Sequence, residues 1–206
     1  MKPVYIGTSG YSYSHWSKVF YPRELPQSKW LEYYAENFNT VELNVTFYRL
    51  PQESAFSTWY KKTPKDFTFA VKGSRFITHV KKLNNIEDSL VLFMKRAKIL
   101  KEKLGVILWQ LPPNLKINTE RLEDFLKNLK KYKHINAFEF RNESWFDEKI
   151  YSLLKKYNSV LVIADSPRYP LEEILTADFV YVRFHGGKVL YGSEYSKKEL
   201  KKSKKT

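Results

Sequence analysis

The chain has 206 residues, the size of one domain or of one large α/β barrel. It is 43% hydrophobic and 17% aromatic, which excludes a disordered chain, and the absence of cysteine excludes disulfides, thiolate nucleophiles and cysteine-ligated zinc. The formal net charge is +14; the last ten residues, KKELKKSKKT, hold six lysines and one glutamate, so +9 remains on residues 1–196. A basic body favours an anionic partner such as nucleic acid or a phosphorylated metabolite. The alternative is a lysine-rich proteome, since lysine and glutamate enrichment also marks thermophiles.

The start of the chain carries no leader that resembles a signal peptide, because Met1 is followed almost at once by strand-like residues. No apolar run approaches the roughly 20 residues that a membrane span needs. Together with the lack of cysteine, these features predict a cytoplasmic protein with no membrane partner.

Strand-like and helix-like segments alternate along the chain. The strand candidates are residues 4–7, 40–44, 67–72, 105–110, 136–141, 160–165 and 179–185. The helix candidates are residues 28–37, 53–62, 89–103, 119–131, 147–157 and a shorter 171–176. Thr119 and Asp147 are predicted to cap the helices that they open. An amphipathic helix lying on a sheet is indicated by Leu122, Phe125, Leu126 and Leu129.

This alternation is typical of a parallel sheet with helical crossovers, and it predicts a single α/β domain over residues 1–196 with a lysine-rich tail at 197–206. An open doubly wound sheet usually carries a glycine-rich phosphate loop after its first strand, whereas GTSG at 7–10 does not continue as G-x-G-x-x-G. A TIM-like (β/α) barrel is favoured, because polar residues gather where the strands end, and barrels build their sites at that end.

The strand-end residues form the candidate site. They are Glu42, Asn44, Lys72, Gln110, Glu139, Arg141, Asp165, Arg183 and His185, with Ser74, Arg75 and His79 just after the third strand. In AFEFR, Glu139 and Arg141 share one parity while the phenylalanines take the other, which places both charges at the barrel mouth. If the barrel closes, these side chains converge from six strands.

Residue chemistry suggests roles for this set. Glu139, Asp165 and Glu42 are candidates for general acid or base, and His185 for proton transfer. The candidates for holding phosphate or carboxylate are Lys72, Arg141, Arg183, Asn44, Gln110, Tyr48, Arg49 and Arg75. A divalent metal on Glu139, Asp165 and His185 is a further hypothesis, although no local ligand spacing supports it. The alternative for Glu139 and Arg141 is a structural ion pair, and Asp165 could instead cap a turn.

Aromatic residues crowd the loops after the first two strands. Tyr11, Tyr13, Tyr48 and Arg49 could stack bases and hold phosphates, since aromatic and basic residues interleave there. The alternative is that the aromatic residues pack long loops over the barrel.

Seven motifs in fixed order resemble the YecE-like family, domain-of-unknown-function family seventy-two. They are GTSGYSYSHW, FYP, TVELNVTFYRLP, KGSRFITH, LGVILWQLPP, AFEFRNESW and VYVRFHG. The resemblance covers residues 4 to about 200 and implies a TIM-like barrel in a cytoplasmic protein with no established activity. A likeness to metal-dependent barrel nucleases enters as a hypothesis only. The resemblance also places Thr46 among the shared motif positions, beside the site candidates above.

The resemblance implies an eighth strand that this sequence does not reach, because YSKKEL looks like the start of the preceding helix. A seven-stranded barrel would leave an open seam with two unpaired edges, which the tail or a second copy could cover. Three functions follow as hypotheses. The first is an enzyme, such as a hydrolase, acting on a phosphate-bearing substrate or nucleic acid. The others are a nucleic-acid-binding protein without catalysis and a degenerate barrel that serves as a scaffold.

Overall fold

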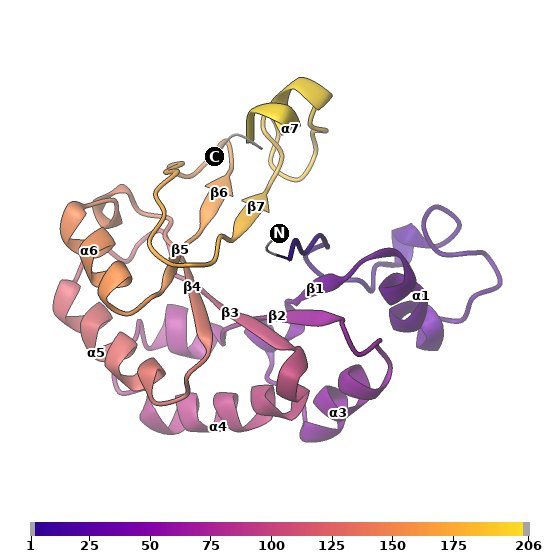
Figure 1. Cartoon of the computed structure of the whole chain (residues 1–206), viewed down its shortest axis with the longest axis horizontal. Helices are drawn as coiled ribbons and strands as arrows, with labels where there is room; N and C mark the ends of the chain where they lie inside the picture. Colours follow the sequence, from indigo (N-terminus) through magenta and orange to yellow (C-terminus); the bar gives the residue numbers. More distant parts are fainter. Residues whose placement is uncertain (1–2, 204–206) are drawn as a thin grey trace. The chain divides into compact units, whose positions relative to one another are not determined.

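The structure, a computed structural model, describes residues 3–203 (Figure 1). The chain divides into two compact units, of which the first ends at Leu108 and the second begins at Trp109. Strands alternate with helices in both units, and every strand pair described below is parallel, so the predicted α/β class is confirmed. The prediction of one domain over residues 1–196 stays a prediction.

The first unit is built on three parallel strands. β1 (Thr40–Leu43) pairs with β2 (Thr68–Lys72), which pairs with β3 (Leu104–Gln110) as far as Leu108. A register shift between Phe69 and Ala70 interrupts the second pairing. Apart from Thr40, Thr68 and Gly105, the residues of these strands are buried, as is typical of strands in parallel sheets.

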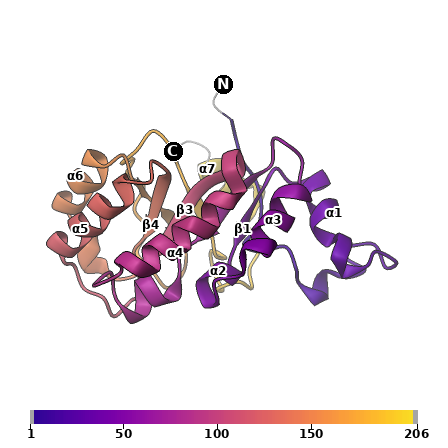
Figure 2. The ribbon, with the colours of Figure 1, turned by 90° about the horizontal axis from the view of Figure 1, so that it is seen from below.

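Helices cover one face of this sheet. Figures 1 and 2 both show α3 (Glu53–Lys61) and α4 (Glu87–Ala97) lying side by side across it. The other helical segments of this unit are η1 (Ser14–Trp16), η2 (Gln27–Lys29), α1 (Trp30–Asn37), α2 (Val45–Tyr48), the π-helix η3 (Phe76–Val80) and η4 (Lys98–Lys103). Sequence periodicity missed α2 and η3, because segments of four or five residues are too short to show it.

A lysine side chain is buried at the end of α3. Nζ of Lys103 donates hydrogen bonds to the carbonyl oxygens of Tyr60 at 2.6 Å and Thr63 at 2.7 Å, and to Oγ1 of Thr63 at 3.1 Å. Burial lowers the pKa of this amine, although Glu102 and Asp66 act in the opposite direction. The lysine thereby satisfies carbonyl groups that the end of a helix leaves unpaired.

The predicted first strand, residues 4–7, is wrong. Val4 and Ile6 are exposed, and their backbone groups bond the side-chain amide of Asn39, with Ile6 N donating to Oδ1 and Nδ2 donating to Val4 O, both at 2.8 Å. Ladder-type bonds begin only further on, where Glu42 N donates to Thr8 O. A side-chain amide replaces the strand partner here, which sequence alternation cannot reveal.

The second unit combines short strands with two long helices. β4 (Ile135–Glu139) pairs with β5 (Val160–Leu161), and β6 (Ile163–Asp165) pairs with β7 (Val182–Phe184). α5 (Thr119–Lys130) and α6 (Glu148–Lys156) pack side by side, as Figures 1 and 2 both show. η5 (Glu143–Trp145) and α7 (Lys197–Ser203) complete the unit.

Two predictions for this unit need correction. The strand predicted at 160–165 divides at Val162, whose N–H donates to Phe138 O, whereas the next N–H, from Ile163, donates to Tyr181 O. The helix predicted at 171–176 is absent. Oγ1 of Thr176 instead accepts from Leu161 N at 2.8 Å and donates to the carbonyl of Ser159, which holds the segment in an irregular course.

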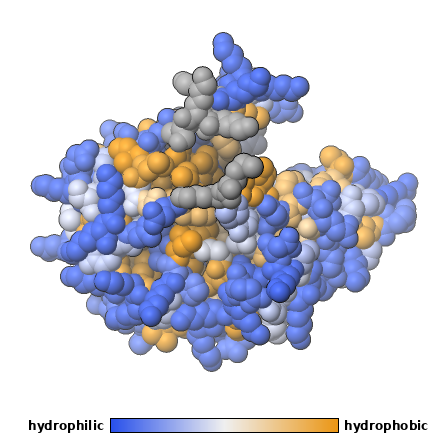
Figure 3. Space-filling view, in the orientation of Figure 1, coloured by the Kyte–Doolittle hydropathy of each residue, from blue (hydrophilic) through white to orange (hydrophobic). Residues whose placement is uncertain are grey.

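A closed barrel is not confirmed, because the pairings within each unit do not form a ring in residues 3–203. The lysine-rich segment predicted as a tail begins with α7, and its last three residues lie outside the described part. Of the helices described, none has the length and apolar character to cross a membrane. Hydrophilic side chains dominate the face in Figure 3.

Candidate functional site

The site is built around the end of β4, where the AFEFR alternation takes its predicted form. Phe138 lies against Phe125 of α5, and Phe140 stacks on Trp145 with ring centroids 4.8 Å apart. Both phenylalanines therefore lie on one face of the strand, and Glu139 points to the opposite face. Its carboxylate is nevertheless only 1% exposed. A carboxylate buried to this extent needs hydrogen-bonding or charged partners.

Both oxygens of Glu139 have partners. Oε1 accepts from Nε2 of Gln110 at 2.8 Å and from Nε of Arg141 at 2.8 Å, while Oε2 accepts from Nη1 of Arg183. Nε2 of His185 lies 3.9 Å from Oε2. We call this set, Gln110, Glu139, Arg141, Arg183 and His185, the Glu139 cluster.

The arginines decide the ionisation of Glu139. Burial on its own raises the pKa of this carboxyl, but the charges of Arg183 and Arg141 and the hydrogen bond from Arg141 outweigh burial. The pKa falls from its ordinary 4.5 to about 2. Glu139 is therefore a carboxylate throughout the neutral range, and it pairs with both Arg141 and Arg183.

Arg183 and His185 lie on the same side of the last strand segment, as their matching parity predicts. Nη1 of Arg183 is 3.3 Å from Nε2 of His185. Because a guanidinium can only donate, this contact is a hydrogen bond only in the tautomer that carries the imidazole proton on Nδ1. His185 is buried, and its ring meets that of Tyr191 edge-on at 5.5 Å between centroids.

Arg141 is the cluster member that reaches outward, with 15% of its side chain exposed. Its Cζ sits over the ring of Tyr169, 4.5 Å from the centroid, and its Nη1 is 3.5 Å from the phenol oxygen. Within residues 3–203, Nη2 of Arg141 has no hydrogen-bond partner, and it is not one of the buried polar atoms that lack a partner. This nitrogen is a donor available to a ligand.

Tyr169 escaped the sequence analysis. It lies in an irregular loop, and no periodicity marks it. The signal that could have found it is SPRYP, in which Pro167 and Pro170 flank an aromatic residue directly after a strand that ends in Asp165. Prolines restrict such a loop and favour a fixed position for the side chain between them.

Asp165 is engaged elsewhere. Its carbonyl accepts from His185 N at 2.9 Å, and its carboxylate interacts with the hydroxyl of Tyr195. Burial raises the pKa of Tyr195, and Asp165 adds to that effect. The same hydroxyl accepts from the N–H of Gly186 at 3.0 Å. Asp165 thus fixes the turn after His185, where Gly186 has a φ of +91° and an added Cβ would lie 2.3 Å from Val189 O.

The residues of the cluster do not fit a divalent metal. Across the described residues, no three histidine or carboxylate side chains gather as a ligand set. Both oxygens of Glu139 already accept from cationic or amide donors, and two guanidinium groups would repel a cation at the same place. The ligand set Glu139, Asp165 and His185 is therefore not assembled in this structure.

The candidates of the first unit form two further groups. Oγ of Ser9 donates to Oε1 of Glu42 at 2.8 Å and accepts from Nδ2 of Asn44 at 2.7 Å. Oδ1 of Asn44 is buried without a partner among the described atoms. Burial raises the pKa of the nearby Tyr13, and the negative charge of Glu42 raises it further.

The second group surrounds the end of β2. Nζ of Lys72 lies over the ring of Phe47, 4.4 Å from its centroid, and His79 meets the same ring edge-on at 5.0 Å. Thr46 donates to the carbonyl of Lys72 at 2.6 Å and is a packing residue. The remaining candidates lie nearby in the chain. Ser74 accepts from Phe76 N, and the exposed side chains are those of Tyr48, Arg49 and Arg75.

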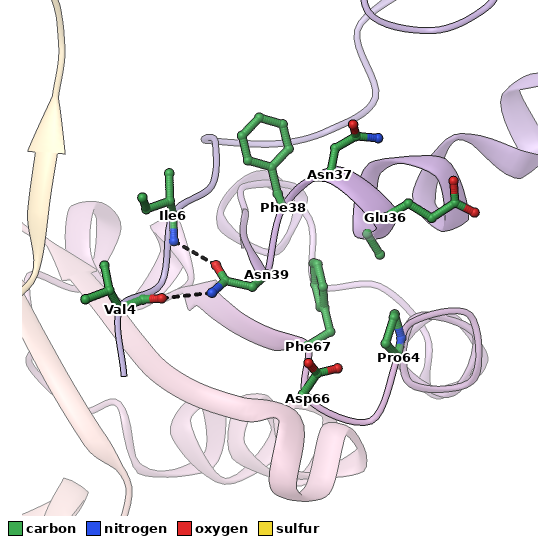
Figure 4. A pocket seen from close by; sticks show the side chains of 10 residues that line it. Val4, Ile6, Glu36, Asn37, Phe38, Asn39, Pro64, Asp66 and Phe67 are labelled. Carbon is green, nitrogen blue, oxygen red and sulfur yellow. Dashed lines mark hydrogen bonds between the residues drawn. The ribbon is translucent and has the colours of Figure 1, made fainter. Parts of the chain in front are cut away.

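A cavity of about 500 Å³ in the first unit contains none of the predicted site residues (Figure 4). Val4 and Ile6 from the N-terminal segment and Phe38 and Phe67 line it. The last two residues precede β1 and β2, so this cavity lies at the beginning of these strands, whereas Glu42 and Lys72 lie at their ends.

The fold and the cluster define an α/β protein with parallel strands and a buried carboxylate shared by two arginines. The family model described as "Protein of unknown function DUF72" matches residues 5–206, and the chain belongs to this family. The predicted resemblance to the YecE-like family is thereby confirmed.

Two curated relatives are named as UPF0759 proteins. The UPF0759 protein YunF of Bacillus subtilis is 28% identical over 204 residues, which cover 89% of this chain and 70% of YunF. The UPF0759 protein YecE of Escherichia coli K12 is 32% identical over 109 residues, which cover 53% of this chain and 38% of YecE.

Solved structures of the same family are similar to this one. The DUF72 family protein TM1631 of Thermotoga maritima has a TM-score of 0.82 at 33% identity, with 97% of this chain and 84% of that chain covered. The DUF72 family protein EF0366 of Enterococcus faecalis has a TM-score of 0.72 at 22% identity over 85% and 78% of the two chains, a likeness of fold alone.

Proposed function

We propose that the protein binds a phosphate-bearing ligand at the Glu139 cluster. The observation that carries this proposal is the guanidinium of Arg141, which the buried Glu139 carboxylate holds through Nε at 2.8 Å while 15% of the side chain stays exposed. Nη2 of Arg141 supplies the free donor at the exposed side of the cluster. Arginines held in this way bind oxyanions with little loss of side-chain freedom.

Glu139 serves in this proposal as an anchor for the arginines and not as the acid or base. A carboxylate with a pKa of about 2 and both oxygens engaged is a weak base at neutral pH. Proton transfer to a bound ligand would fall to His185, the histidine of the cluster, whose Nε2 lies 3.3 Å from Nη1 of Arg183. An enzyme acting on phosphate-bearing substrates remains part of the proposal through that residue.

The barrel and the cytoplasmic location belong to the same proposal. The parallel βα order supports a TIM-like barrel. The absence of cysteine supports a reducing compartment.

Isothermal titration with phenyl phosphate at pH 7.5 tests the binding proposal. We expect saturable binding to the intact protein and a loss of at least about tenfold in affinity on Arg141→Met, because a charge-assisted hydrogen-bond pair is removed. Arg23→Met is the matched control, since the Arg23 side chain is 76% exposed in the first unit. Absence of binding, or equal losses in both variants, would reject the proposal.

A further inference from the structure

We infer that Tyr169 is a ligand-binding residue of the Glu139 cluster, and that its hydroxyl selects a tetrahedral phosphoryl group over a planar carboxylate. This inference rests on the proposed anion site at Arg141 and deepens it. It assigns a donor and a basis for specificity to a residue in a loop without regular structure.

The first step is the geometry around the Arg141 guanidinium. Nε is directed to Glu139 at 2.8 Å, and the Tyr169 ring closes one side of the group with Cζ 4.5 Å from its centroid. A ligand is therefore left with the edge formed by Nη1 and Nη2. That edge can hold two oxygens of one anion in the bidentate manner typical of arginine.

The second step is the balance of donors and acceptors at the Tyr169 hydroxyl. Nη1 of Arg141 can only donate, so the phenol oxygen accepts in their 3.5 Å contact. The proton of the phenol is then not used in that contact. The contact is also at the long limit of hydrogen bonding and is easily lengthened when an anion enters. The hydroxyl thus lies beside the free edge of Arg141 with a proton to donate.

The third step is the number of oxygens that a ligand carries. A carboxylate has two, and both lie in the plane of the guanidinium when they bind Nη1 and Nη2 in the bidentate manner. A phosphate monoester has three non-bridging oxygens, so one of them lies out of that plane. Because Tyr169 lies over the face of the Arg141 guanidinium, its hydroxyl is placed to donate to this out-of-plane oxygen, which a planar carboxylate lacks.

The loop that carries Tyr169 is suited to this role. Pro167 and Pro170 restrict the backbone on either side, and Arg168 N donates to Oγ of Ser166 at 3.2 Å. Tyr169 is half-buried, so ordering it on binding costs little entropy. The phenol is thus positioned before a ligand arrives.

The experiment compares two ligands of matched body, phenyl phosphate and benzoate, by isothermal titration at pH 7.5. We expect Tyr169→Phe to weaken phenyl phosphate about tenfold and to leave benzoate unchanged, because the ring stays and only the hydroxyl is lost. Tyr169→Ala should weaken both ligands, since the ring that positions Arg141 is removed. Tyr157→Phe is the control, because its phenol bonds the Glu123 carboxylate on the surface.

The outcomes separate this inference from the proposal beneath it. If the intact protein binds neither ligand, or Arg141→Met has no effect, the anion site itself is rejected and the inference falls with it. If Arg141→Met abolishes binding while Tyr169→Phe keeps the ratio of the two affinities, the site stands and the role of Tyr169 is overturned. Circular dichroism of each variant confirms that a loss reflects binding and not unfolding.

Discussion

Glu139 places a buried negative charge in the second unit, where it forms ion pairs with Arg141 and Arg183. Removing an ion pair from water costs more than its attraction returns unless further hydrogen bonds complete it, and here Gln110 and two arginines supply them. Such an arrangement contributes little net stability compared with apolar packing. Such a cluster therefore fits a binding role better than a purely structural one.

The first prediction concerns acid unfolding. The pKa of Glu139 is about 2 in the folded protein and near 4.5 when unfolded, so its contribution is complete above pH 4.5 and is lost as the pH falls towards 2. A shift of this size corresponds to about 3 kcal/mol. Urea unfolding between pH 5 and 2 should show this loss, and a free energy of unfolding that is flat across the window would contradict it.

The second prediction concerns Glu139→Gln, which removes the negative charge that Arg141 and the buried Arg183 share. We expect the free energy of unfolding to fall by roughly 3 kcal/mol or more at pH 7. Phosphate should restore part of this loss, because the anion replaces the missing charge.

Glu123→Gln provides the comparison for this variant, since Glu123 pairs with Lys156 on the surface at 2.7 Å. Its cost should be much smaller than that of Glu139→Gln, because solvent screens the pair, and phosphate should not alter it. Thermal unfolding with and without phosphate measures both variants. Equal costs, or equal effects of phosphate, would contradict the assignment.

At the scale of elements, helix starts show what local sequence does and does not determine. Asp147 caps α6 as predicted, with its carboxylate accepting from Lys149 N at 2.8 Å. The cap of α5 is Asn118, whose Oδ1 accepts from Arg121 N at 2.9 Å, whereas Thr119 was predicted and is the first helical residue. Adjacent capping residues cannot be ranked from sequence, because the backbone angle of each position decides.

The third prediction follows from that correction. Asn118→Ala should lower the free energy of unfolding by about 1 kcal/mol, because Arg121 N loses its acceptor. Thr119→Ala, one residue along, should change it by a few tenths of a kcal/mol at most. Chemical denaturation of both variants makes the comparison, and a larger effect at Thr119 would show that the helix starts one residue later.

Strand boundaries depend on partners that lie far away in sequence. Six of the predicted strand regions contain a strand, since their buried apolar runs are a local property. The break at Val162 was not predictable, because it arises where successive N–H groups change from Phe138 to Tyr181 as acceptor. The irregular course of 171–176 likewise depends on Thr176 bonding to β5.

For the molecule as a whole, the net charge of +14 is the property that bears on nucleic-acid binding. The fourth prediction is that a fluorescent single-stranded oligonucleotide, followed by anisotropy, binds at 50 mM salt and loses at least about tenfold in affinity by 200 mM, through counterion release. Arg141→Met should leave that slope nearly unchanged. Binding that is independent of salt, or absent at 50 mM, would reject this alternative function.

The candidate site was predictable from sequence to a limited extent. Parity placed Glu139 with Arg141, and Arg183 with His185, because alternation along a strand is a local property. Asp165 was predicted as a site residue but contacts Tyr195, whereas Tyr169, which was not predicted, contacts Arg141. The sequence could not show either position, because each depends on how a loop folds back on a strand end. The charges alone could not show whether Glu139 is a catalyst or an anchor, because burial and both arginines set its pKa together.

The lysine that closes the end of α3 has a consequence for covalent chemistry on this lysine-rich surface. Amine-directed acylating reagents attack deprotonated, accessible amines, and a lowered pKa alone would make Lys103 a preferred target. Its burial and its hydrogen bonds to three acceptors instead keep the amine from reacting with such reagents. Mass-spectrometric footprinting would therefore read modification of Lys103 as a report that the carboxyl end of this helix has opened.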